Sequence, residues 1–122
     1  SHGSPAPFYA LSNFAKHPFV FEGVQIASME GFLQSLKFQD QEKQRAICQL
    51  SGHEAKAAGD EAPRVNKVMY WKGVAYRRTH SEYNELLDRA YCTMMESNPA
   101  FANALKETNE EELIQTIGLR TK

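Results

Sequence analysis

An acid, an amide and an amine recur at helical spacing in the segment from Ser28 to Phe38. At about 100° per residue, a helix here would place Glu30, Gln34 and Lys37 within an arc of about 60°. A positioned carboxylate can transfer protons, and a lysine amine can act as a nucleophile when it is neutral. Because an exposed lysine with a pKa of about 10.4 is charged at neutral pH, such chemistry requires a partly buried site.

The same residues also have a structural explanation. Glu and Lys three or four positions apart on a helix often form a solvated pair that contributes only about 0.2–0.5 kcal/mol. Gly31 lies inside the expected helix, where glycine costs about 1 kcal/mol relative to alanine. That cost is tolerated where another group must come close to the backbone, or where a mediocre helix former is simply accepted. The sequence leaves these interpretations open.

Composition indicates a single domain. The chain has 122 residues, a formal net charge of −1 and a pI of about 6.4. We therefore expect one core over residues 1–122, and no global basic field to attract nucleic acid or an anionic membrane. No run approaches the ~18 apolar residues that a membrane helix needs. With no signal-like start, Cys48 and Cys92 are expected to be reduced, packed thiols of a soluble cytoplasmic protein. The sequence leaves open whether either end is complete.

Periodicity and capping signals predict a helix-rich α+β domain with a few short strands near the two ends. Segment 68–76 is rich in strand-forming residues, but Gly73 interrupts it, so strand and irregular loop both remain open. Ser51 and Glu54 have the spacing of a capping box. The expected elements are strands at 19–21 and 24–26, helices at 28–38, 40–50, 51–59, 81–96 and 99–106, and a strand at 113–117.

Other potential sites are weaker. The four histidines are dispersed and neither cysteine has a partner at ligand spacing, so we expect no metal and no cofactor. Trp71 lies near Tyr70, Tyr76 and two arginines, a combination that can stack a planar ring and hold a phosphate. A buried Trp71 with solvated arginines is an equally good interpretation.

Several blocks, taken in order, resemble the NADAR superfamily, and the resemblance covers most of the chain. Its strongest part is the segment with glutamate, glutamine and lysine-phenylalanine, combined with an upstream asparagine-phenylalanine. The blocks are Leu11-Ser12-Asn13-Phe14, Pro18, Gly23, Ser28-Met29-Glu30, Gln34, Lys37-Phe38, Ala55-Lys56 and Gly59, followed by Trp71, Asn98-Pro99 and 113–118.

This resemblance implies an α+β fold and an N-glycosidase that cleaves a nitrogen–ribose bond. Its substrate would be a phosphoribosylated riboflavin-pathway intermediate or ADP-ribose attached to a guanine base. By the same resemblance, Lys37 would attack ribose C1 and hold it as a Schiff base, while Glu30 would carry protons.

The resemblance also implies the residues around the substrate. Asn13 and Gln34 would orient the sugar, and Phe14 or Trp71 would stack on the base or wall the pocket. Gly31, where many relatives have a histidine, would bear on substrate preference.

Two further functions remain open. One is a non-catalytic module that binds ADP-ribose or NAD-derived nucleotides, and the other is a helical interaction domain with Glu30 and Lys37 on its surface. Within the enzyme interpretation, the near-neutral charge favours a small molecule or a terminal base over extended duplex. ADP-ribosylated nucleic acid remains a possible partner.

Overall fold

The computed structural model describes residues 16–62 and 67–106. Within these ranges the chain forms five helices and two antiparallel strand pairs, which confirms the α+β prediction. The expected strand at 113–117 lies outside the described residues. The elements are β1 (Phe19–Phe21), β2 (Val24–Ile26), α2 (Met29–Ser35), α3 (Gln41–Cys48), α4 (Gly52–Gly59), β3 (Val68–Trp71), β4 (Val74–Arg77), α5 (Ser81–Ser97) and α6 (Pro99–Lys106).

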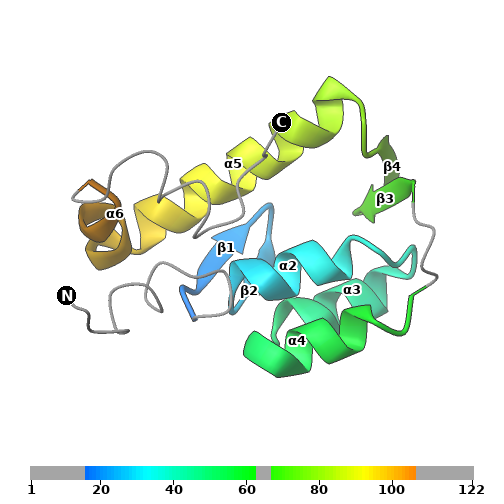
Figure 1. Cartoon of the computed structure of the whole chain (residues 1–122), viewed down its shortest axis with the longest axis horizontal. Coiled ribbons are helices and arrows are strands. Elements are labelled where there is room, and N and C mark those ends of the chain that lie inside the picture. Colours follow the sequence, from blue (N-terminus) through cyan, green and yellow to red (C-terminus); the bar gives the residue numbers. More distant parts are fainter. Residues whose placement is uncertain (1–15, 63–66, 107–122) are drawn as a thin grey trace.

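The β1–β2 hairpin separates the two helical parts of the domain (Figure 1). Helices α2, α3 and α4 cluster on one side of it, and the long helix α5 crosses on the other side. The β3–β4 hairpin lies near the beginning of α5, with which β4 is in contact. The sequence analysis expected strands near the two ends of the chain, but the β3–β4 hairpin, Val68–Arg77, lies in the middle of the sequence.

Both hairpins turn through the same two-residue geometry. Glu22 and Gly23 have φ angles of 51° and 84°, and Lys72 and Gly73 have φ angles of 50° and 84°. Positive φ at both central positions is the signature of the type I′ turn, which matches the twist of the flanking strands. Gly73, which interrupts the run of strand-forming residues in segment 68–76, thus lies in the turn between β3 and β4.

Helix α2 begins as predicted but ends earlier. The Ser28 hydroxyl accepts a hydrogen bond from the Gly31 amide at 3.0 Å and donates to the Leu50 carbonyl at 2.9 Å. The helix ends at Ser35, and the chain continues to Phe38 through bonds from residue i to residue i−3. Lys37 therefore lies in a tighter turn that follows the helix.

The other helices confirm most of the expected bounds. Asp40 caps α3 by accepting from the Glu42 amide at 3.0 Å. The capping box predicted at Ser51 is wrong, because the Ser51 side chain makes no capping bond even though α4 begins directly after it. Helix α5 buries one apolar face, formed by Leu86, Leu87, Ala90, Tyr91 and Met94, whose helical spacing is visible in the sequence.

One buried amide joins α2, α3 and β3. Gln44, 2% exposed, donates through its Nε2 to the carbonyls of Tyr70 at 2.6 Å, Phe38 at 2.8 Å and Ser35 at 3.2 Å. Beside it, the Tyr70 amide donates to the Leu36 carbonyl at 2.8 Å. These bonds attach β3 to the turn that carries Lys37.

We predict that Gln44→Leu lowers the free energy of unfolding by about 3 kcal/mol, because buried carbonyls lose their donor and each unsatisfied group costs about 1–3 kcal/mol. Urea denaturation monitored by circular dichroism measures the change. The control is Gln41→Leu, an exposed glutamine on the same helix, which should change stability by less than about 0.5 kcal/mol. Equal stabilities for the two variants would contradict the role given to Gln44.

Candidate functional site

Glu30 is a buried acid. It lies in the first turn of α2 and is 9% exposed. Its Oε2 accepts a hydrogen bond from Gln34 Nε2, with 2.6 Å between the two atoms. The structure thus brings together two of the three polar residues that the helical spacing placed on one stripe. The two residues are one turn apart along α2, the spacing at which side chains at positions i and i+4 contact each other.

The second polar atom of the Gln34 amide is in a different situation. Gln34 Oε1 is buried and has no hydrogen-bond partner among the described residues. It lies against Gly59 at the end of α4, where the Cβ of any other residue would collide with Gln34 Oε1 and would lie 2.5 Å from its Cδ. The amide therefore occupies the space that Gly59 leaves by having no side chain.

Lys37 is half-buried and lies two residues beyond the end of α2. Its amide donates to the Gln34 carbonyl at 3.2 Å, which fixes its backbone relative to the Glu30–Gln34 pair. Glu30 lies in the first turn of α2 and Lys37 lies in the turn that follows the helix, so the two residues are at opposite ends of the helix.

Gly31 lies at a close helix contact. A Cβ there would lie 2.6 Å from the Leu50 carbonyl oxygen and 2.8 Å from the Ile47 carbonyl oxygen. The close approach inferred from the sequence is present, and the approaching group is the backbone at the end of α3. Gly31 thus permits the packing of α2 on α3, and the structure places protein rather than an open pocket beside it.

Trp71 is part of the core. It is 2% exposed, and its ring lies 5.0 Å from that of Phe32 and 5.8 Å from that of Phe21, between centroids. Its Nε1 donates to Glu22 Oε1 at 3.0 Å, and Arg89 contacts the other oxygen of Glu22 at 3.3 Å. Of the two interpretations of Trp71, the structure supports the buried one.

Two predicted site residues, Asn13 and Phe14, lie outside the described residues. Gly59 belongs to one of the sequence blocks that resemble the NADAR superfamily, but it is not among the predicted site residues. The local pattern marks Gly59 only as the end of the expected helix 51–59, because its contact with Gln34 involves a different helix. The chain separation between Gly59 and Gln34 is the reason why sequence reasoning misses this contact.

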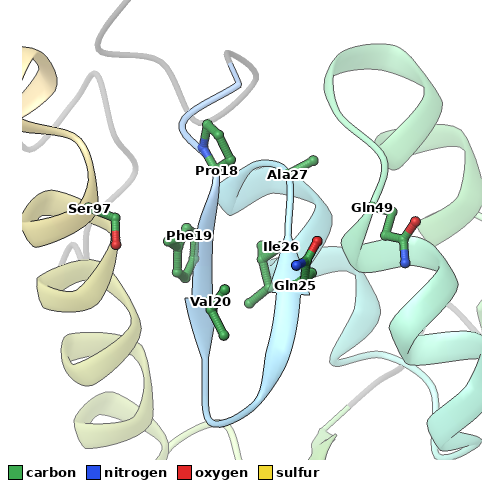
Figure 2. A pocket seen from close by; sticks show the side chains of 8 residues that line it. All are labelled: Pro18, Phe19, Val20, Gln25, Ile26, Ala27, Gln49 and Ser97. Carbon is green, nitrogen blue, oxygen red and sulfur yellow. The ribbon is translucent and has the colours of Figure 1, made fainter.

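A separate pocket of about 570 Å³ lies along the β1–β2 hairpin (Figure 2). The hairpin lies between α5, which contributes Ser97, and the end of α3, which contributes Gln49. The described lining of this pocket is uncharged and includes neither Glu30 nor Lys37. The lining residues are Pro18, Phe19, Val20, Gln25, Ile26, Ala27, Gln49 and Ser97.

The two cysteines have different environments. Cys48 is fully buried, and burial raises its thiol pKa to about 11 despite the opposing effect of its hydrogen bond to Ser35. Cys92 is exposed on α5, so the expectation that both thiols are packed is wrong for Cys92. Both are free thiols.

Metal ligands and membrane spans are two further features that bear on function. No group of three or more histidine, cysteine, aspartate or glutamate residues in 16–62 and 67–106 could hold a metal ion. In the same ranges, no helix has the length and apolar character needed to cross a membrane.

This small α+β domain, with its buried carboxylate–amide pair, belongs to a bacteriophage protein family. The model of the family "Bacteriophage protein GP30.3" matches residues 6–122, which is nearly the whole chain. The chain is also similar to the "Uncharacterized 17.1 kDa protein in Gp30-rIII intergenic region" of Enterobacteria phage T4. The two are 38% identical over 113 residues, which cover 91% of this chain and 74% of the relative. No solved structure matches the chain significantly.

The family match corrects the resemblance drawn from the sequence. The ordered blocks from Leu11 to Gly59 suggested the NADAR superfamily, whereas the comparison assigns the chain to the GP30.3 family. Most of those blocks are short, and several of their residues are types that any small domain requires at turns and caps.

We predict that one of the two thiols reacts rapidly with a disulfide reagent at pH 8 in the native protein. The thiolate is the reactive form, so burial and the raised pKa protect Cys48, while Cys92 is accessible. Absorbance of the released thiolate counts the reacting groups. Cys92→Ser should abolish the rapid phase, and both thiols should react in denaturant. Rapid labelling of native Cys92→Ser protein would contradict the burial of Cys48.

Proposed function

We propose that the protein is an N-glycosidase that hydrolyses the nitrogen–ribose bond of an ADP-ribosyl or phosphoribosyl adduct. In this proposal Lys37 is the nucleophile and Glu30 carries protons. The observation that supports it best is the burial of Glu30, 9% exposed, with the uncharged Gln34 amide as its described hydrogen-bond partner.

Burial of this carboxylate is difficult to explain by stability alone. Removing a charge from water costs several kcal/mol unless it is paired, and a neutral amide offsets only part of that cost. A pair of apolar side chains at positions 30 and 34 would pack between α2 and α4 without the cost. Retention of an acid there is therefore consistent with a chemical role.

In the proposed reaction, Lys37 attacks a ribose carbon and Glu30 transfers protons. Lys37 Nζ would form a bond to ribose C1 as the C1–N bond breaks, and the electron pair of that bond would pass to the leaving base. Glu30, in its acid form, would give a proton to the base. Glu30, now ionised, would take a proton from the lysine nitrogen and return it to the ring oxygen as the C1–O bond breaks, which gives a protonated imine. Water then adds to the imine carbon, which releases the sugar and restores the amine.

The choice of substrate follows from charge. A formal net charge of −1 gives the chain no global basic field, which favours a small adduct or a modified terminal base over a long duplex. ADP-ribosylated guanine and a phosphoribosylated riboflavin-pathway intermediate both satisfy this condition. We place the reaction in the cytoplasm, a reducing compartment that suits the free thiols of Cys48 and Cys92.

Borohydride trapping tests the proposal. The protein would be incubated with ADP-ribosylated guanosine, or with the phosphoribosylated intermediate, in the presence of sodium cyanoborohydride. Intact-mass spectrometry should show a substrate-dependent adduct that is absent in Lys37→Arg and retained in Lys56→Arg, an exposed lysine on α4. Release of the free base should slow by about 10²–10⁴-fold in Glu30→Gln, the range for loss of acid–base catalysis.

Calorimetry with ADP-ribose completes the test. If ADP-ribose binds but neither an adduct nor base release is observed, the protein would be a non-catalytic module for NAD-derived nucleotides and not an enzyme. An adduct that persists in Lys37→Arg would reject Lys37 as the nucleophile.

A further inference from the structure

Helices α2 and α4 approach closely at one point in the candidate site. The Gln34 amide lies directly on Gly59, in the space where any other residue would have its Cβ. Gln34 Oε1 is buried by this contact, and Gln34 Nε2 is directed at Glu30. A glycine on one helix thus determines where the amide on the other helix can lie.

The backbone at Gly59 gives no other reason for a glycine. Gly23, Gly52 and Gly73 have positive φ angles, but Gly59 is not among the glycines with this conformation. Glycine at a helical position costs about 1 kcal/mol relative to alanine. Alanine would suit this backbone better, but its Cβ would displace the Gln34 side chain from its present position.

The Gln34 amide, held against Gly59, in turn restricts the Glu30 carboxylate. The 2.6 Å bond from Nε2 reaches one oxygen of Glu30, Oε2. Because the amide is planar, contact of its oxygen side with Gly59 orients its NH₂ side toward Glu30. That bond holds one oxygen of the carboxylate, and in the proposed function the other oxygen, Oε1, would exchange protons with the substrate.

We infer that Gly59 is a positioning residue. By leaving space for the Gln34 amide, it fixes the position of that amide, which in turn orients the Glu30 carboxylate for proton transfer. The catalytic part of this inference rests on the proposed function, whereas the seating of the amide does not. A side chain at position 59 would displace Gln34 and release Glu30 without touching the substrate.

A double-mutant cycle with Gly59→Ala and Gln34→Ala tests the inference. In the Gly59→Ala variant, the side-chain NH₂ signals of Gln34 should shift in ¹H–¹⁵N spectra, and their exchange with solvent should accelerate. The kcat for base release should fall on the order of 100-fold, as expected when a reacting group is displaced by about 1 Å, with KM unchanged. Adding Gly59→Ala to Gln34→Ala should cause no further fall, because the clashing amide is gone.

The matched control is Ala57→Ser, which adds one heavy atom to an exposed position of the same helix. It should leave the Gln34 signals and kcat unchanged. If Gly59→Ala alone fails to fold, folding of the double variant would still support the contact, and its failure to fold would overturn it.

The outcomes separate the two proposals. Unperturbed Gln34 signals in Gly59→Ala, or additive losses of kcat in the double variant, would overturn the inference. Perturbed signals in a protein that forms no borohydride adduct and releases no base would reject the proposed function while retaining the seating of the amide by Gly59.

Discussion

The arrangement of the candidate site depends on the buried amide of Gln44. Its Nε2 bonds to the carbonyls of Ser35, Phe38 and Tyr70, which come from the end of α2, the following turn and β3. Tyr70 is distant in sequence from the other two, and a single amide joins all three. Since an unsatisfied buried carbonyl is costly, the amide holds the turn in one geometry. The backbone position of Lys37 is a consequence of that geometry.

Helix α2 is stabilised by its neighbours rather than by its own sequence. It has seven residues, fewer than an isolated helix needs, and contains a glycine. Met29 and Phe32 are fully buried in the core, while Gly31 lets the carbonyls of α3 come close and Gln34 contacts α4. Each side of the helix therefore meets a different element. The position of Glu30 is fixed by three separate contacts made by other residues of the same helix.

Local signals in the sequence account for much of the fold. The Glu22-Gly23 turn, the Ser28 cap and the apolar face of α5 depend on residues close to one another in the chain, and all three are predictable. The sequence alone does not decide the β3–β4 hairpin, because Gly73 is equally compatible with a turn and with an irregular loop. The early end of α2 accompanies bonds from Gln44 and Tyr70 to the backbone of residues 35–38, which come from other elements, so local rules cannot anticipate it.

For the site, the sequence predicts the Glu30–Gln34 contact because helical spacing alone brings the two together. It cannot predict that Gly59 lies beneath the amide, because 25 residues separate Gly59 from Gln34 and the approach depends on how α4 packs. The misassigned family has a related cause. Gly23 serves a tight turn, Ser28 caps a helix and Trp71 fills the core, and unrelated folds need residues of these types for the same reasons. Glu30 differs from them, because a buried carboxylate bonded to an amide is no more stable than a well-packed apolar pair. The proposed proton transfer would give that acid a role that packing alone does not.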